Sequence, residues 1–573
     1  MKSGEPVDES ETNAQSATSD GKSLLEKCTR VRGEAHIREG AHRAIAESKA
    51  ALTAAFYGGQ KLQNWKPEND TTFAILVNLV RPAWAYENLS TFEKNSSFRH
   101  KCRPTTMRAL KAFPPFSIYP QGLNMAPRFL GIALGLVFLT SPQAARGDVT
   151  LPKIFGSNMV LQQEQPIKIW GAATAGEEIT VDLNGATAAT KADDKGDWQV
   201  ELPSRKADGK SLTLTVKGKN QIELKNILIG EVWLGSGQSN MEWNVGAAKD
   251  AAKEIAAASH PKIRLFKVQR ARSNTPAKDV VGQWQECSPA TIPGFSATAY
   301  YFARELQQKL NVPVGIIASS WGGTKIEPWT PSNGKGAVLY NAMIHPLAPL
   351  SLRGVIWYQG ESNVLSTAGL KYHEMKKQLI DDWRSAWGNN ELSFYYVHIG
   401  PWSGRYAAGE LPKLWEAQTK SLTLPNTGMA VITDAIDNIA DIHPKSKQVV
   451  GRRLALWALA KNYGRKIVYS GPLYKSKEVE GTKVRVRFAH AKGLAARDGK
   501  PLSEFTIAGS DNKFVQAQAV IDGDTVIVHA EGIDKPKHVR FGWHKTCNPN
   551  LVNGAGLPAA PFQTDGWQGG TGE

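Results

Sequence analysis

The chain has 573 residues, of which 41% are hydrophobic, and a formal net charge of +16. This length exceeds what one hydrophobic core usually organises, so two or three domains are expected. Lysine and arginine alternate with acidic residues instead of forming a basic stripe, so the charge indicates a solvated surface and no nucleic-acid partner.

The four cysteines, Cys28, Cys102, Cys287 and Cys547, lack the spacing of a zinc site. They therefore predict no metal centre. A disulfide between Cys287 and Cys547 is conceivable in an exported protein, but the sequence leaves that pairing open.

A segment at residues 125–147 has the parts of a secretory signal peptide. The stretch Met125-Ala-Pro-Arg128 precedes the apolar run Phe129 to Leu139, and small residues follow up to Gly147. The run is too short to span a membrane, which takes about twenty residues. We interpret Met125 as the true start and residues 1–124 as a non-native or disordered extension. The alternative is a buried apolar helix behind a genuine extension. The first interpretation predicts a secreted or periplasmic protein with no stable membrane insertion after signal removal.

Residues 148–229 carry strand and turn signals at close spacing. Alternating runs such as Ile167 to Trp170, Ile179 to Asp182 and Leu212 to Val216 are separated by Gly, Asp and Asn. This pattern predicts an N-terminal β-sandwich domain.

Residues 230–465 alternate short apolar strands with longer helical segments. Predicted strands are Glu231 to Leu234, Val314 to Ala318, Gly354 to Tyr358, Phe394 to Ile399 and Met429 to Thr433. Apolar residues recur at helical spacing over 299–310, over 372–383 and after Pro444. The alternation predicts an α/β domain whose parallel sheet has helices on both faces. Residues 466–573 return to short strands and predict a C-terminal β domain.

Four polar or Gly-rich segments follow predicted strands, where parallel α/β sheets assemble their sites. The first is Gly235-Ser-Gly-Gln-Ser-Asn-Met241. A serine at a Gly-rich strand exit suits an acyl-transfer nucleophile, and Ser239 is preferred over Ser236. Met241 stands where G-x-S-x-G needs its last glycine, so an ordinary α/β-hydrolase is disfavoured. Taken alone, such a serine is more often structural.

The second and third segments offer hydrogen-bond donors. In Ser319 to Glu327, the paired glycines Gly322 and Gly323 permit close backbone approach to a ligand. In Trp357 to Asn363, Gly360 and Asn363 are candidate donors to a tetrahedral oxyanion. A helix N-cap at Ser362 or Asn363 is the structural alternative.

The fourth segment, Asp434 to Pro444, is rich in carboxylates and contains His443. A histidine can take the serine proton, and a carboxylate behind it fixes its tautomer and stabilises the imidazolium. Taken alone, a histidine before a proline is unremarkable.

The ordered segments resemble the SGNH hydrolases, whose blocks supply Ser, Gly, Asn and His in succession. More narrowly, Gly-Gln-Ser-Asn-Met, Trp-Gly-Gly-Thr, Tyr-Gln-Gly-Glu-Ser-Asn and Asp-Ile-His-Pro resemble the sialate O-acetylesterase family. Gly451-Arg-Arg-Leu-Ala455, Leu151-Pro-Lys-Ile-Phe155 and Met159-Val-Leu-Gln162 extend the resemblance over about 149–566. It implies an SGNH-type, flavodoxin-like parallel sheet flanked by β-sandwich-like domains.

Carried onto matching positions, the resemblance implies Ser239 as the nucleophile and His443 as the base. It implies oxyanion donors from the Ser239 N–H, Gly322 or Gly323, and Asn363. Most SGNH enzymes place an aspartate three residues before the histidine, where this chain has Ala440. Asp441 is the preferred acid. Glu361 is the alternative, as in similar acetyl xylan esterases, and Gln238 is a candidate substrate contact.

The favoured function is O-acetyl ester hydrolysis on sialic acids or acetylated polysaccharides, without a metal or organic cofactor. An acetyl xylan esterase-like polysaccharide deacetylase, a non-catalytic glycan-binding protein and an esterase for apolar acyl chains are the alternatives. The sequence leaves the sugar and the oligomeric state open.

Overall fold

The computed structural model describes residues 148–566. The predicted extension at 1–124 and signal peptide at 125–147 lie outside the described residues, as does the stretch 567–573. Within 148–566, none of the helices combines the length and apolar character that crossing a bilayer needs.

The N-terminal part is built from short strands. They are β1 (Val160–Gln162), β2 (Ile167–Ala172), β3 (Glu178–Leu183), β4 (Ala186–Lys191), β5 (Asp197–Leu202) and β6 (Leu212–Lys217). They pair antiparallel except for β1, which runs parallel to β7 (Gln221–Gly237). One sheet contains β4, β3 and β6, and β2 pairs with β5. Alternate residues of β3, Ile179, Val181 and Leu183, are buried, as the period-two pattern of its sequence requires.

Strand β7 (Gln221–Gly237) passes from this part into the next without a break. Its first residues pair antiparallel with β6, whereas Glu231 to Gly237 pair parallel with β10. A side chain at Gly230 would bring Cβ within 2.1 Å of the Pro313 carbonyl oxygen. The predicted domain boundary at 229/230 therefore falls inside one strand.

The central sheet has the strand order β13-β12-β11-β7-β10-β8-β9. Its further members are β8 (His260–Lys267), β9 (Trp284–Cys287), β10 (Val314–Ser320), β11 (Gly354–Tyr358), β12 (Ser393–His398) and β13 (Thr427–Val431). Neighbours are parallel except β9, which runs antiparallel to β8. Strands occur at all five predicted positions. Strands β8 and β9 were not predicted, because β8 has charged residues between its apolar ones and β9 is only four residues long.

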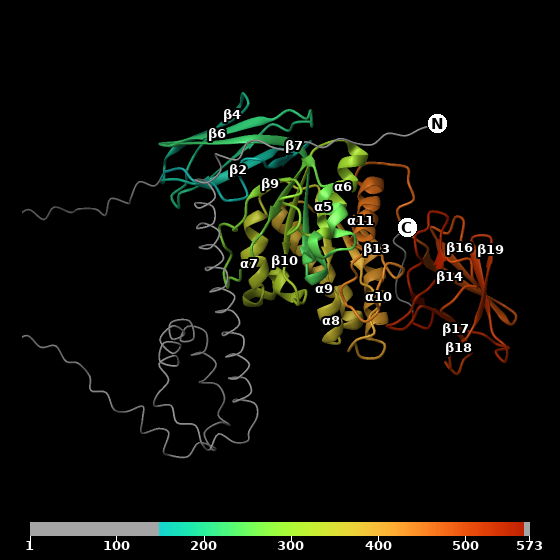
Figure 1. Cartoon of the computed structure of the whole chain (residues 1–573). Helices are drawn as coiled ribbons and strands as arrows, with labels where there is room; N and C mark the ends of the chain where they lie inside the picture. Colours follow the sequence, from blue (N-terminus) through green and yellow to red (C-terminus); the bar gives the residue numbers. More distant parts are fainter. Residues whose placement is uncertain (1–147, 567–573) are drawn as a thin grey trace, which may run out of the picture. The chain divides into compact units, whose positions relative to one another are not determined.

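Helices connect these strands. They are α4 (Ser239–Glu242), α5 (Ala251–Ala256), α6 (Ala297–Leu310), α7 (Val338–Met343), α8 (Glu361–Leu365), α9 (Tyr372–Trp387), α10 (Glu410–Lys420) and α11 (Lys447–Lys461). Helix α6 lies beside α11, and the two helices contact β10 and β13 respectively (Figure 1). Val450, Leu454 and Trp457 of α11 are buried, as their helical spacing predicts.

The C-terminal part consists of strands with a core of their own. Two four-stranded sheets have the orders β14-β15-β20-β19 and β18-β17-β21-β23, and β16 pairs with β22. The strands are β14 (Leu473–Glu480), β15 (Lys483–Ala489), β16 (Ala495–Ala496), β17 (Phe505–Ala508), β18 (Val515–Gln516), β19 (Gln518–Asp522), β20 (Thr525–His529), β21 (His538–Phe541), β22 (Leu551–Val552) and β23 (Phe562–Gln563). A separate apolar cluster fills this part, whereas the N-terminal strands share one cluster with the central sheet. Cys287 and Cys547 are buried free thiols, so the structure does not pair them.

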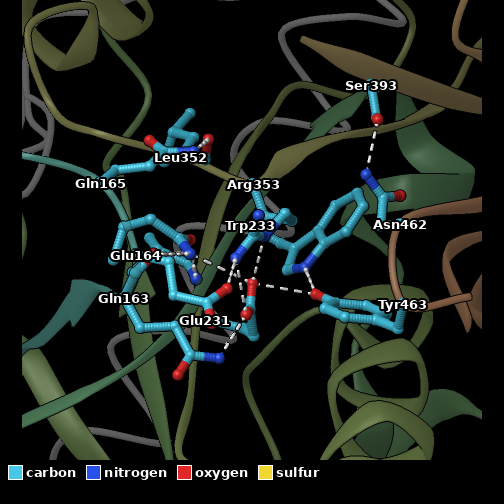
Figure 2. A network of polar contacts seen from close by, with 12 residues as sticks. Gln163, Glu164, Gln165, Glu231, Trp233, Leu352, Arg353, Ser393, Asn462 and Tyr463 are labelled. Carbon is cyan, nitrogen blue, oxygen red and sulfur yellow. Dashed lines mark hydrogen bonds and ion pairs between the residues drawn. The ribbon is translucent and has the colours of Figure 1, made fainter. Parts of the chain in front are cut away.

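Glu231 lies where β7 enters the central sheet. There its carboxylate forms a buried ion pair with Arg353 and contacts two further segments of the chain. The Glu231 carboxylate is fully buried and accepts hydrogen bonds from Arg353 Nε at 2.7 Å, Gln163 Nε2 at 2.6 Å and the Tyr463 hydroxyl at 3.0 Å. Figure 2 shows these side chains converging on Glu231. The network fixes the N-terminal strands and the segment after α11 to the sheet that carries the candidate site.

Candidate active site

Ser239 stands where β7 ends and the short helix α4 begins. Gly237 permits this turn, because its φ is +137° and a Cβ there would lie 2.2 Å from the Tyr358 carbonyl oxygen. The Gln238 N–H donates to that same carbonyl at 2.9 Å. The Ser239 N–H belongs to the first turn of α4, where N–H groups have no intrahelical acceptor.

His443 meets Ser239 although 204 positions separate them in the chain. Its Nε2 lies 3.0 Å from the Ser239 Oγ, a hydrogen-bond distance. The imidazole stacks on Trp243, with ring centroids 4.8 Å apart. Trp243 follows Ser239 by four residues, so the nucleophile's own segment also supports the base.

Asp441 is the carboxylate that contacts His443. Asp441 Oδ1 accepts the His443 backbone N–H at 2.9 Å and lies 3.4 Å from Nδ1. Burial lowers the pKa of His443 below its usual 6.5, while the charge of Asp441 pulls the pKa back upward. Neutral imidazole, the form that accepts a proton, is therefore favoured near neutral pH.

The loop that carries His443 is held by hydrogen bonds to its backbone. Trp402 Nε1 donates to the Ala440 carbonyl at 3.0 Å, and the Ser403 N–H donates to the Ile439 carbonyl at 2.9 Å. Lys545 in turn donates to the carbonyl oxygens of Gly404 and Tyr406. The C-terminal part therefore braces the segment against which the His443 loop lies.

Of the two paired glycines, Gly322 packs directly on the serine. A Cβ at Gly322 would lie 3.2 Å from the Ser239 Cβ, whereas Gly323, with φ of +75°, faces open space. The Gly322 N–H donates to Glu242 Oε2 at 2.8 Å, and Arg270 pairs with that carboxylate through two hydrogen bonds of 2.6 Å. The donor expected at Gly322 is thus beside Ser239 and faces Glu242.

The other two predicted oxyanion donors have partners inside the protein. Asn363 is fully buried, and its Nδ2 donates to Glu327 Oε2 at 3.1 Å. The Gly360 N–H points to Gln238 Oε1 at 3.5 Å, and the Ser362 N–H donates to the same oxygen at 3.2 Å. These contacts give no support to Gly360 or Asn363 as oxyanion donors. Through them the buried side chain of Gln238 links the Ser239 loop to the Gly360 loop.

The two alternative residues, Ser236 and Glu361, are both buried. Ser236 lies within β7 opposite Ser319 and Trp357 of the neighbouring strands, and it is fully buried. Glu361 Oε1 accepts from Asn240 at 2.5 Å, and no contact joins Glu361 to His443 in residues 148–566. The geometry therefore favours Ser239 over Ser236 and Asp441 over Glu361.

A cavity of about 810 Å³ reaches Glu242, the last residue of α4, but its lining includes neither Ser239 nor His443. Glu242 and Ser320 line it, together with basic and amide side chains that include Lys267, Arg270 and Gln269. Its volume is in the range of small-molecule sites. Across the described part of the chain, no three His, Cys, Asp or Glu side chains group closely enough to hold a metal ion.

Sequence reasoning missed Trp243, Glu242 and Arg270. Trp243 and Glu242 lie on the nucleophile's own turn, at i+4 and i+3, and that spacing was the available signal. No sequence signal pointed to Arg270, because an arginine in a loop cannot be distinguished by sequence from an ordinary solvent-exposed charge.

Comparisons with known proteins agree with this geometry. A family model described as carbohydrate esterase, sialic acid-specific acetylesterase, matches residues 229–460. The human sialate O-acetylesterase is 32% identical over 406 residues, covering 60% of this chain and 77% of the human protein. The rat protein of that name is 30% identical over 441 residues, covering 62% and 81% respectively.

A solved structure extends the similarity to nearly all described parts. A carbohydrate acetylesterase from Xanthomonas citri superposes with a TM-score of 0.71 at 39% sequence identity. The match covers 73% of this chain and 100% of that protein. The chain therefore belongs to the sialate O-acetylesterase family of carbohydrate esterases.

Proposed function

We propose that this protein is an SGNH-type serine esterase that removes O-acetyl groups from carbohydrates. The observation that carries the proposal is the 3.0 Å contact between Ser239 Oγ and His443 Nε2. Family membership assigns the reaction class, and this contact supplies the nucleophile and base that such a reaction needs.

In the first half-reaction, Ser239 Oγ attacks the acetyl carbonyl carbon while His443 Nε2 accepts the hydroxyl proton. Asp441 orients the imidazole and stabilises the imidazolium that forms. The sugar oxygen then leaves, takes its proton from His443, and an acetyl-serine remains. In the second half-reaction, water attacks this ester with His443 again as the base, and acetate is released.

The oxyanion of each tetrahedral intermediate needs hydrogen-bond donors, each contributing about 3 kcal/mol to the transition state. The Ser239 N–H and the Gly322 N–H are the donors closest to the serine. For Gly322 to contribute, the substrate oxygen has to replace Glu242 Oε2, which occupies that N–H at 2.8 Å.

The lining of the 810 Å³ cavity favours a polar acyl acceptor. Lys267, Arg270 and Gln269 offer hydrogen bonds that sugar hydroxyls or a sugar carboxylate can use and an apolar acyl chain cannot. Acetylated sialic acids and acetylated polysaccharides both meet this requirement. We also infer export to the periplasm or the medium, on the signal-like pattern of residues 125–147.

The test is acetate release from a panel of O-acetylated sialic acids, acetylated polysaccharides and nitrophenyl esters of increasing acyl length. We expect acetyl sugars to be hydrolysed and long-chain esters to react poorly. Ser239→Ala should lower turnover by about 10⁴-fold or more, because it removes the nucleophile. Ser236→Ala makes the same chemical change three residues earlier, within β7, and should retain activity. Wild-type turnover by Ser239→Ala would disprove the mechanism.

A further inference from the structure

Three buried polar side chains lie directly behind the Ser239–His443 pair. Asn240 and Lys447 are fully buried, and Glu361 is 3% exposed. They come from α4, α11 and α8, three elements far apart in the chain. Burying a lysine and a glutamate costs several kcal/mol for each ion unless partners compensate. Such a placement calls for a specific set of contacts.

The contacts centre on the side-chain amide of Asn240. Lys447 Nζ donates to Asn240 Oδ1 at 2.5 Å. Asn240 Nδ2 donates to Glu361 Oε1 at 2.5 Å and to the Ile442 carbonyl oxygen at 3.0 Å. Asn240 follows Ser239 and Ile442 precedes His443, so one amide links the neighbours of the two reacting side chains.

The two charges determine which way this amide points. A lysine ammonium has donors only, and an ionised carboxylate has acceptors only. The amide oxygen therefore has to face Lys447, and the amide nitrogen has to face Glu361 and the Ile442 carbonyl. A flipped amide would set Oδ1 against both Glu361 and that carbonyl oxygen, and the link would be lost.

The charges of Lys447 and Glu361 also depend on the groups around them. Lys447 Nζ lies 5.1 Å from the centre of the Tyr358 ring. Burial outweighs the opposing charge of Glu361 and leaves the pKa of Lys447 at about 7; burial likewise raises the pKa of Glu361 against the effects of Asn240 and Lys447. Each charge thus stabilises the charged form of the other.

We propose that Asn240, Glu361 and Lys447 form a buried clamp that fixes the Ile442 carbonyl and thereby holds His443 at hydrogen-bond distance from Ser239. The three are positioning residues for the esterase reaction, and the inference rests on the proposed function. It assigns Glu361 to the clamp and leaves Asp441 as the carboxylate of His443.

The first test uses Lys447→Met and the isosteric Asn240→Asp, which puts a carboxylate oxygen where Nδ2 was. A displacement of His443 by about 1 Å is expected to lower kcat by roughly 100-fold. KM should change little, because no clamp residue lines the cavity. Lys376→Met is the matched control: Lys376 is also fully buried, over the Tyr396 ring, and lies outside the clamp. Because its Nζ has no hydrogen-bond partner among the described residues, the methionine should keep or raise thermal stability and leave kcat near the wild-type value.

The second test separates positioning from stability. Lys447→Met leaves Glu361 as an unpaired buried charge, and the double variant Lys447→Met/Glu361→Gln removes that charge. The double variant should regain melting temperature relative to Lys447→Met, yet its kcat should stay low, because neither charge then orients the Asn240 amide. If kcat recovers together with stability, the role is merely structural and the proposal fails.

A serine-directed fluorophosphonate supplies a readout that needs no sugar. Its rate of reaction with Ser239 depends on the contact with His443, so Lys447→Met and Asn240→Asp should be labelled at least about tenfold more slowly than wild type. Folded variants with wild-type labelling would overturn the clamp. A wild-type protein that is labelled at Ser239 but releases no acetate from any sugar would instead overturn the proposed function.

Discussion

At the scale of single residues, the contacts of His443 determine how the reaction should respond to pH. Burial disfavours the imidazolium, whereas Asp441, with Oδ1 3.4 Å from Nδ1, favours it, and burial is the stronger effect. The proton acceptor is the neutral ring. Activity should therefore appear as pH rises through a pKa lower than that of free histidine.

We predict that the acid limb of kcat/KM has its midpoint below pH 6.5. Asp441→Asn removes a charge that raises the His443 pKa, so the midpoint should move to lower pH. The rate should fall by about 10³- to 10⁴-fold, because the imidazole loses its orienting carboxylate.

Glu361→Gln is the matched control in a pH–rate series from pH 4 to 9. As a clamp residue it should lower the rate, but Glu361 does not contact His443, so the midpoint should move less than in Asp441→Asn. A midpoint that moves in Glu361→Gln and not in Asp441→Asn would reverse the assignment of the acid.

At the scale of elements, strand β7 carries the site because of its register with β10 and β11. Gly237 pairs with Tyr358 of β11 and with Ser320 of β10, and Ser239 follows two residues later. Three strand ends thus place the serine, the glycine loop and the Gln359 to Asn363 loop at one edge of the sheet. The edge is the carboxyl end of the parallel strands, where ligands of α/β proteins bind.

We predict that Gly237→Ala destabilises the fold and also impairs the site. A side chain at φ of +137° costs about 1–3 kcal/mol. Its Cβ would also push against the Tyr358 carbonyl that holds Gln238, and so displace Ser239. Urea unfolding measures the first effect, and kcat at a temperature where the variant is folded measures the second.

Gly294→Ala is the control for that variant. No atom lies within 4 Å of the Cβ that it adds, so stability and kcat should remain close to wild type. Equal behaviour of the two variants would mean that the turn at Gly237 tolerates an ordinary side chain and does not position the nucleophile.

At the scale of the whole molecule, the N-terminal strands and the central sheet form one cooperative body. They share a single apolar cluster, and the Glu231 network ties them together with polar contacts (Figure 2). Glu231 lies about 20 Å from Gly237, the end of β7 that precedes Ser239, at a strand rise near 3.3 Å per residue. Stability and catalysis are therefore separable at this position.

We predict that Glu231→Gln lowers the free energy of unfolding by about 3–5 kcal/mol, because Arg353 loses the partner of a buried ion pair. The carboxylate of Glu164 is half-exposed and lies 3.5 Å from the Arg353 guanidinium. Glu164→Gln should therefore lower the free energy of unfolding by less than about 1 kcal/mol. Denaturant unfolding compares the two variants. Both should keep wild-type kcat while folded, and a large loss of kcat in Glu231→Gln would show that the network reaches the site.

The sequence by itself determined the strands at the five predicted positions of the central sheet, the β character of both flanking parts, and the family. These properties depend on local period, turn residues and short motifs, all of which can be read within a few neighbouring positions. The candidate roles of Ser239 and His443 also came from motifs of this kind. Strands β8 and β9 were not predicted because their own residues carry too little pattern; β8 is stabilised by pairing with β10, and β9 by pairing with β8.

Only the tertiary structure decided which polar groups meet. Asp441 and Glu361 were equal in kind as partners of His443, and only the path of the chain brings Asp441 to the imidazole and Glu361 to Asn240. Gly322, Gly360 and Asn363 were all suitable donors, yet only Gly322 packs on Ser239. The physical reason is that a hydrogen bond between residues hundreds of positions apart depends on how the intervening elements pack, and no local pattern encodes that distance.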